Sequence, residues 1–140
     1  MRLTAGDIPR TEEALALYRA VGWTAYTQVP ERLLRSLAGS HLVITARDDD
    51  GALLGLARTV SDGQSICYIQ DILVHPDAQR RGVGRALLQD VRERYRHCMF
   101  LALSTDAEGT PDAERSHPLY RELGFTSHAE LGMAAFGYRP

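Results

Sequence analysis

The sequence predicts a single domain of mixed α/β architecture, in which helices cover both faces of one sheet. Helical and strand-like patterns follow one another along the 140 residues, and a glycine-rich turn joins a buried strand to an amphipathic helix. No repeat or linker-like run interrupts them, so we expect one domain over residues 1–140. With 44% hydrophobic and 24% charged residues, the composition is that of a chain that folds on its own.

Charge and cysteine usage exclude several classes of function. Sixteen Lys and Arg residues against eighteen Asp and Glu residues provide no basic field that would attract nucleic acid or anionic lipid. The N-terminus has no apolar signal segment, and no run approaches the ~20 apolar residues of a membrane span. We therefore expect a cytoplasmic protein without a nucleic-acid or membrane partner. Cys67 and Cys98 lie in apolar runs, which predicts two buried free thiols and no metal site.

The N-terminal half predicts two helices followed by an antiparallel strand pair. Thr11 and the two glutamates after it predict a helix that continues to about Val21. A second helix is expected to begin at Pro30 and to end at Gly39. Strands are expected at His41–Ala46 and Ala52–Val60, joined by a hairpin turn at residues 49–51.

The second half predicts a strand, a long amphipathic helix and a shorter closing section. The run Ser65–Val74 is rich in β-branched and aromatic residues and ends before Pro76, as a buried strand does. From Gly82 to Tyr95, apolar residues recur at helical spacing. The remaining expected elements are a strand at Cys98–Leu103, a long loop at Ser104–Ser116, a short helix at Leu119–Gly124 and two closing strands from Phe125 onward.

The segment from Val74 to Arg85 is suited to an anion. It carries three arginines and two glycines immediately before a helix, whose first backbone amides have no partner inside the helix and attract negative charge. It contains no GxxxxGK[ST] P-loop. It also departs from the dinucleotide-binding GxGxxG, because Leu87 stands where the third glycine belongs. A nucleotide-binding protein is therefore disfavoured.

A third template fits this segment. Gln79-Arg80-Arg81-Gly82-Val83-Gly84, preceded by Ile72-Leu73-Val74-His75-Pro76, resembles the acetyl-coenzyme A signature of the GNAT acetyltransferases. A second match is Leu119-Tyr120-Arg121-Glu122-Leu123-Gly124-Phe125, which is similar to the family's F-Y-x-x-x-G-F. The motifs extend from Ile66 to Phe125, and the order of elements agrees along the whole chain. Ser104-Thr105-Asp106 and Ser116 depart from the residues that the family often carries in this loop. The resemblance implies a mostly antiparallel sheet with a central splayed strand pair.

The resemblance also implies acetyl-coenzyme A as the cofactor and an amine as the acceptor. The pyrophosphate would lie on the backbone amides of the turn, with charge from its arginines. The main chain at the end of the preceding strand would bind the pantetheine and donate one amide to the thioester oxygen. The expected cofactor-binding residues are Ile72, Leu73, Val74, Gln79, Arg80, Arg81, Gly82, Val83, Gly84 and Arg85.

Tyr120 matches the family position of the acid that protonates the leaving thiolate, since a phenol keeps its proton at neutral pH. The base that removes the amine proton is less clearly marked. Asp71 is placed first as a catalytic residue. The alternatives are Gln70 acting through a water, Tyr68, His75 and His117. Regular alternation would put Tyr68, Gln70 and Ile72 on one face of their strand and Asp71 on the other.

Four residues are expected on the acceptor side, namely Trp23, Tyr26, Tyr68 and Gln70. Aromatic rings between the two N-terminal helices are suited to a cationic amine. The predicted function is transfer of an acetyl group to a primary amine of a small molecule, peptide or protein. The alternative is a non-catalytic acyl-coenzyme A-binding or regulatory module of the same fold. The expected closing strands near Leu131–Tyr138 would also allow a homodimer.

Overall fold

The computed structural model describes residues 1–140, which divide into two units, residues 1–104 and residues 105–140. The first unit is built on one five-stranded sheet in the order β1-β2-β3-β4-β5. The strands are β1 (Arg2–Ala5), β2 (Leu42–Arg47), β3 (Leu53–Ser61), β4 (Ile66–Val74) and β5 (Phe100–Leu103).

Neighbouring strands are antiparallel from β1 to β4, and β5 is parallel to β4. The predicted mixed sheet is therefore confirmed. The predicted strands agree with β2 to β5 within a few residues, whereas no sequence pattern predicted β1.

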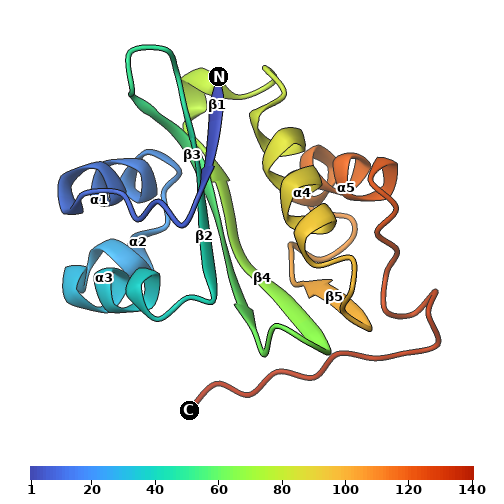
Figure 1. The fold of residues 1–140 in the computed structure, drawn as a ribbon. Coiled ribbons are helices and arrows are strands. Elements are labelled where there is room, and N and C mark those ends of the chain that lie inside the picture. The colour runs from blue at the N-terminus through green and yellow to red at the C-terminus, as the bar shows by residue number, and fades with distance from the viewer. The chain divides into compact units, whose positions relative to one another are not determined.

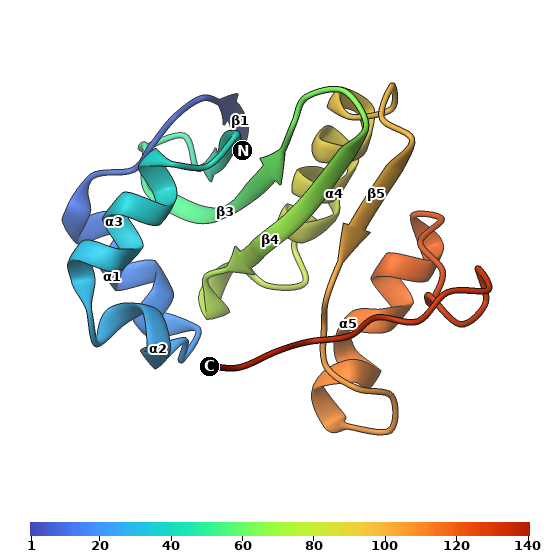
Figure 2. The same cartoon turned by 90° about the horizontal axis from the view of Figure 1, so that it is seen from below.

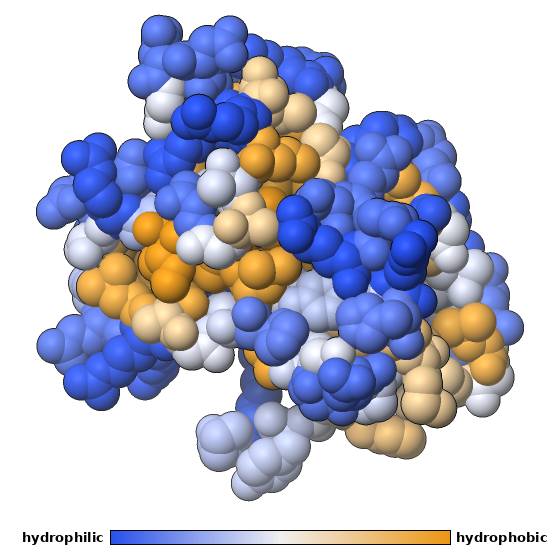
Figure 3. All heavy atoms as spheres, in the orientation of Figure 1, coloured by the Kyte–Doolittle hydropathy of each residue, from blue (hydrophilic) through white to orange (hydrophobic).

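Helices cover both faces of this sheet (Figure 1). One face carries α1 (Thr11–Ala20), α2 (Thr24–Thr27) and α3 (Pro30–Ala38), and the other carries α4 (Val83–Arg94). Apolar side chains gather where α1 and α3 meet the sheet, while hydrophilic side chains cover their outer surfaces (Figure 3). None of the helices has the length and apolar character that crossing a bilayer requires. The core under the first three helices is formed by Ala14, Leu17, Tyr18, Leu33, Leu37, Val43, Leu56 and Leu73.

An irregularity in β4 changes which side chains share a face. Arg58 of β3 pairs with Asp71, but the next residue of β3, Thr59, pairs with Ile69, so Gln70 is the extra residue of a β-bulge. The bulge breaks the alternation, and both Gln70 and Asp71 reach the hydroxyl of Tyr26 on α2. The prediction that Gln70 and Asp71 lie on opposite faces is therefore wrong, because strict alternation holds only for a regular strand.

The second unit contains one helix, α5 (Pro111–Glu122), which begins earlier than predicted. Thr110 caps it by accepting a hydrogen bond from the Ala113 amide at 3.2 Å, and Pro111 occupies its first turn. Its polar N-terminal half lacks the apolar periodicity on which the prediction relied. The predicted end is confirmed, since Gly124 follows the helix with a positive φ of 88°.

The expected closing strands are absent. Residues 125–140 contain turns and irregular backbone, and the side chains of Phe136 and Tyr138 are exposed. In a half-buried strand every second side chain is apolar, so the apolar residues all fall on odd positions or all on even positions. Here Leu131 and Met133 occupy odd positions, whereas Phe136 and Tyr138 occupy even ones. The basis for pairing two copies through strands at 131–138 is therefore also removed.

Both cysteines are free. Cys67 is buried on β4, where burial raises the pKa of its thiol to about 12. Cys98 is only partly buried, because it lies in the turn after α4. The prediction of two buried thiols is therefore confirmed for Cys67 alone.

Candidate active site

The turn between β4 and α4 leaves unfilled space beside Gly82, at the start of the helix. After a short 3₁₀ turn at Pro76–Ala78, residues 79–82 lead into α4, with Arg80 at φ 60° and Gly82 at φ 82°. A side chain at Gly82 would be strained by this left-handed backbone, although it would meet no atom within 4 Å. The backbone conformation at residue 82 thus favours glycine, and the space beside Gly82 is open.

Backbone amides and arginines give this turn a positive character. The amide of Ala86 donates to the Gly82 carbonyl at 2.9 Å and closes the first turn of α4, so the amides before it lie at the positive end of the helix dipole. Arg80, Arg81 and Arg85 are exposed around it. Gln79 lies nearby, and its side chain donates to the Val74 carbonyl at 3.3 Å. The predicted cofactor residues of the turn are therefore brought together in a form that suits a phosphate.

The end of β4 is parted from β5. The two strands pair only from Ile66 to Ile69 on β4, opposite Phe100 to Leu103 on β5. Beyond this point β4 continues to Val74 alongside β3 alone, and Figure 2 shows β4 and β5 diverging. The backbone edge of Ile72–Val74 on this side therefore has no strand partner, as the expected splayed pair requires.

A buried polar cluster occupies the α1–α2 side of β4. The Arg58 guanidinium and the Asp71 carboxylate form an ion pair, and these residues are only 6% and 2% exposed. Tyr18 donates to Oδ2 of Asp71 and Tyr26 donates to Oδ1, both at 2.8 Å. Arg58 also donates to the Tyr26 hydroxyl at 3.0 Å. Both carboxylate oxygens are thus occupied, as a buried charge demands.

Three of the four expected acceptor residues lie at the edge of this cluster. The Trp23 ring stacks on Tyr26 with centroids 6.3 Å apart and is 36% exposed. The Gln70 side-chain amide lies 3.4 Å from the Tyr26 hydroxyl. The fourth residue, Tyr68, donates instead to the Ser104 hydroxyl.

The sequence reasoning missed Arg58 and Tyr18. Arg58 carried a usable signal, because a charge inside the apolar strand Ala52–Val60 needs an opposite charge on a neighbouring strand. Asp71 is the only acidic residue of β4. Tyr18 carried no such signal, since a tyrosine on the apolar face of α1 is an ordinary core residue.

Comparison with known proteins agrees with this geometry. The family model described as "Acetyltransferase (GNAT) family" matches residues 8–125. The chain belongs to the GNAT family. The solved structure of a GNAT-family acetyltransferase from Streptococcus pneumoniae TIGR4 is similar, with 29% sequence identity and a TM-score of 0.83, over 99% of this chain and 97% of that one.

Two proteins of known sequence are also similar. The uncharacterized N-acetyltransferase ycf52 of Pyropia yezoensis is 26% identical over 122 residues, which are 85% of this chain and 66% of that protein. The mycothiol acetyltransferase of Kineococcus radiotolerans is 41% identical over 87 residues, which are 58% of this chain and 27% of that protein. The chain thus spans less than two thirds of the length of these relatives.

Tyr120, the predicted acid, lies on α5 in the second unit. Burial raises the pKa of its hydroxyl, which therefore keeps its proton. Two of the alternative base candidates are engaged by backbone groups. His75 accepts a hydrogen bond from the Asp77 amide at 3.2 Å, and a ring nitrogen of His117 lies 2.9 Å from the Asp106 carbonyl.

Proposed function

We propose that this GNAT protein is an N-acetyltransferase that moves an acetyl group from acetyl-coenzyme A to a primary amine. The observation that carries the proposal is the parted end of β4, which leads directly into the open glycine turn before α4. A backbone edge without a strand partner, followed by a positive helix terminus, suits an amide-containing chain that ends in a pyrophosphate. The family membership and the names of the relatives support the same activity.

Acetyl-coenzyme A supplies the acetyl group as an activated thioester. In our proposal, the amides from Arg81 to Arg85 and the neighbouring arginines hold the pyrophosphate, and the main chain at Ile72–Val74 holds the pantetheine. One amide of that edge donates to the thioester oxygen as negative charge develops on it. These assignments need no metal ion.

Tyr120 is proposed as the acid. The amine nitrogen forms a bond to the acetyl carbon, the carbon–sulfur bond breaks, and the Tyr120 hydroxyl gives its proton to the departing thiolate. The proton that the nitrogen loses passes to water, and Tyr120 regains a proton from solvent. Its raised pKa keeps the proton on Tyr120 at neutral pH, as this role requires. Asp71 was expected to be the base, but its oxygens accept bonds from Tyr18, Tyr26 and Arg58, so any proton it receives from the amine must pass through Tyr26.

An assay of thiol release tests the proposal and the role of the turn together. Acetyl-coenzyme A is mixed with spermidine, glucosamine or a lysine-containing peptide, and acetylated products are identified by mass spectrometry. Arg80→Glu is expected to raise KM for acetyl-coenzyme A about tenfold, because it places a negative charge beside the pyrophosphate.

The matched control is Arg96→Glu, which reverses an exposed charge after the far end of α4 and should leave that KM within about twofold. Binding of acetyl-coenzyme A without acetylation of any amine would favour the non-catalytic module instead. An equal KM in wild type and Arg80→Glu would contradict the proposed site.

A further inference from the structure

The hydroxyl of Tyr26 has a limited number of hydrogen bonds to make. A phenol carries one hydrogen and two acceptor positions on its oxygen. The hydrogen goes to Oδ1 of Asp71 at 2.8 Å, and Arg58 donates to one acceptor position at 3.0 Å. The second acceptor position faces the Gln70 side-chain amide at 3.4 Å, the longest contact of the three. The Tyr26 oxygen therefore has one acceptor position whose hydrogen bond, from Gln70, is weak.

The direction of these bonds is fixed by their buried partners. An ionised Asp71 can only accept hydrogen bonds, and Arg58 can only donate them. Tyr18 occupies Oδ2 of the same carboxylate, so the Tyr26 proton has a single partner, Oδ1. Burial, reinforced by the bond to Asp71, raises the pKa of Tyr26 and keeps it a neutral phenol. Any new ligand of this oxygen must therefore be a hydrogen-bond donor.

The surroundings of this oxygen suit an amine. The exposed side chain of Gln70 belongs to the bulge and must turn only its terminal amide to release the long contact. The Trp23 ring stacks on Tyr26 and remains partly exposed, so it supplies an apolar flank beside the polar atom. The Arg58–Asp71 pair carries no net charge, so it does not repel an ammonium group that approaches before losing its proton.

We propose that the Tyr26 hydroxyl accepts an N–H bond from the acceptor amine in place of Gln70, and that Arg58 and Asp71 are positioning residues that present it. The proposal rests on the proposed transferase function and concerns its acceptor side. An amine held through one N–H keeps its nitrogen lone pair available for the bond to the acetyl carbon. The buried ion pair acts on the amine only through Tyr26.

The variant Tyr26→Phe removes the oxygen and keeps the ring that packs on Tyr18 and Trp23. We expect KM for the amine to rise about tenfold while the Kd of acetyl-coenzyme A is unchanged. Trp23 is the only tryptophan and lies next to Tyr26, so its fluorescence reports amine binding directly. Spermidine, glucosamine and a lysine-containing peptide are titrated in turn. Tyr95→Phe removes a buried hydroxyl on the α4 side and serves as the matched control.

A second variant tests the positioning role without leaving a buried charge alone. Arg58→Met combined with Asp71→Leu replaces the ion pair by apolar side chains, a change that buried pairs tolerate. The double variant is expected to bind acetyl-coenzyme A normally and to show the same tenfold rise in amine KM. Adding Tyr26→Phe to it should cause no further rise, because the hydroxyl has already lost its orientation. A purely structural pair would instead give independent, additive effects.

The outcomes separate this proposal from the proposed function. If wild type acetylates an amine and Tyr26→Phe keeps the wild-type KM and Trp23 titration, the role of Tyr26 is wrong and the function stands. If the triple variant shows additive losses, Arg58 and Asp71 do not act through Tyr26. If wild type neither binds acetyl-coenzyme A nor releases thiol, the function fails and this proposal fails with it.

Discussion

Tyr120 is a single side chain whose surroundings decide its chemistry. Removal from water raises its pKa, a hydrogen bond with Thr105 opposes this rise, and the nearby charge of Asp106 adds to it. The hydroxyl therefore stays protonated through neutral pH and has a proton to give. Tyr26 is also kept neutral by burial, but its proton is already committed to Asp71. Two tyrosines of the same chain thus have opposite proposed roles, one giving a proton and the other accepting a hydrogen bond.

The change Tyr120→Phe removes the proposed acid and keeps the ring beside Phe125. We expect kcat to fall about a hundredfold or more, because the thiolate then leaves without a proton. The Kd of acetyl-coenzyme A should not change. In wild type, the raised pKa predicts that kcat persists as pH rises to about 10. Steady-state kinetics with Tyr138→Phe, an exposed tyrosine, as the control measure this, and an unchanged kcat in Tyr120→Phe would refute the assignment.

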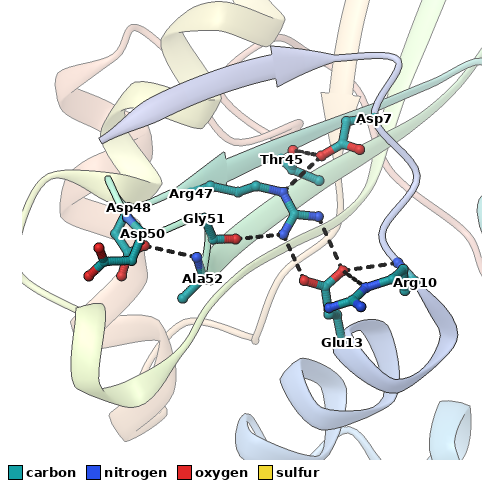
Figure 4. A network of polar contacts seen from close by, with 9 residues as sticks. All are labelled: Asp7, Arg10, Glu13, Thr45, Arg47, Asp48, Asp50, Gly51 and Ala52. Atoms are coloured by element: carbon teal, nitrogen blue, oxygen red, sulfur yellow. Dashed lines mark hydrogen bonds and ion pairs between the residues drawn. The ribbon is translucent and has the colours of Figure 1, made fainter.

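At the scale of elements, one polar network ties β2 to α1 and to the loop between β1 and α1 (Figure 4). Arg47 on β2 bonds Asp7 at 3.0 Å, Glu13 on α1 at 2.8 Å and the Gly51 carbonyl at 2.9 Å. Thr45 donates to the same Asp7 carboxylate at 2.5 Å. The hydrogen bond from Arg47 is the main cause that lowers the pKa of Glu13 to about 2. Arg47 therefore joins three segments that the sheet alone does not connect.

Arg47→Met is expected to lower the free energy of unfolding by about 2 kcal/mol at pH 7, because Glu13 and Asp7 lose their shared donor. A depressed pKa in the folded state stabilises the protein above the ordinary value of 4.5 and ceases to do so as pH falls to about 2. The difference between wild type and variant should therefore shrink over that range. Urea unfolding at several pH values measures it. Arg35→Met, which removes an exposed ion pair with Glu31, should have almost no effect, and an equal loss in both variants would contradict the account.

Elements whose apolar residues recur at regular spacing were predictable from sequence. Features that depend on a helix cap or on pairing between strands were not. The apolar stripe from Val83 to Tyr95 predicted α4, and Gly124 marked the end of α5. The polar first half of α5 begins with the Thr110 cap and Pro111. These two residues alone are a weak sequence signal for a helix when no apolar residues recur at helical spacing after them. The bulge at Gln70 arises from the pairing of two strands, so no pattern within β4 alone reveals it. The hydrogen bonds of Asp71 to Tyr18 and Tyr26 join distant segments and were not predictable, whereas the lone charges of Arg58 and Asp71 on neighbouring apolar strands could have indicated their ion pair.

At the scale of the whole molecule, the proposed functions are divided between the two units. The glycine turn, the parted strands and the Tyr26 cluster belong to residues 1–104, whereas Tyr120 belongs to residues 105–140. The first unit contains most of the buried apolar side chains, while Ala113 and Leu123 are those of the second. We therefore expect cofactor binding to depend chiefly on the first unit and the acid step on the second. The acetyl-coenzyme A motif was predictable from sequence because its residues follow one another in the chain. The residues of the acceptor cluster come from separate elements, so no single stretch of sequence indicates them.

The measurement that tests the central claim most directly is a calorimetric titration of acetyl-coenzyme A into the full chain. Wild type is expected to bind with a Kd on the order of 1–100 μM. Gly82→Asp, which adds a carboxylate and a strained backbone at the turn, should abolish binding. Gly6→Asp carries the same strain in equally open space away from the turn and should bind as wild type does. Folded wild type that releases no heat, or Gly82→Asp that binds normally, would contradict the account.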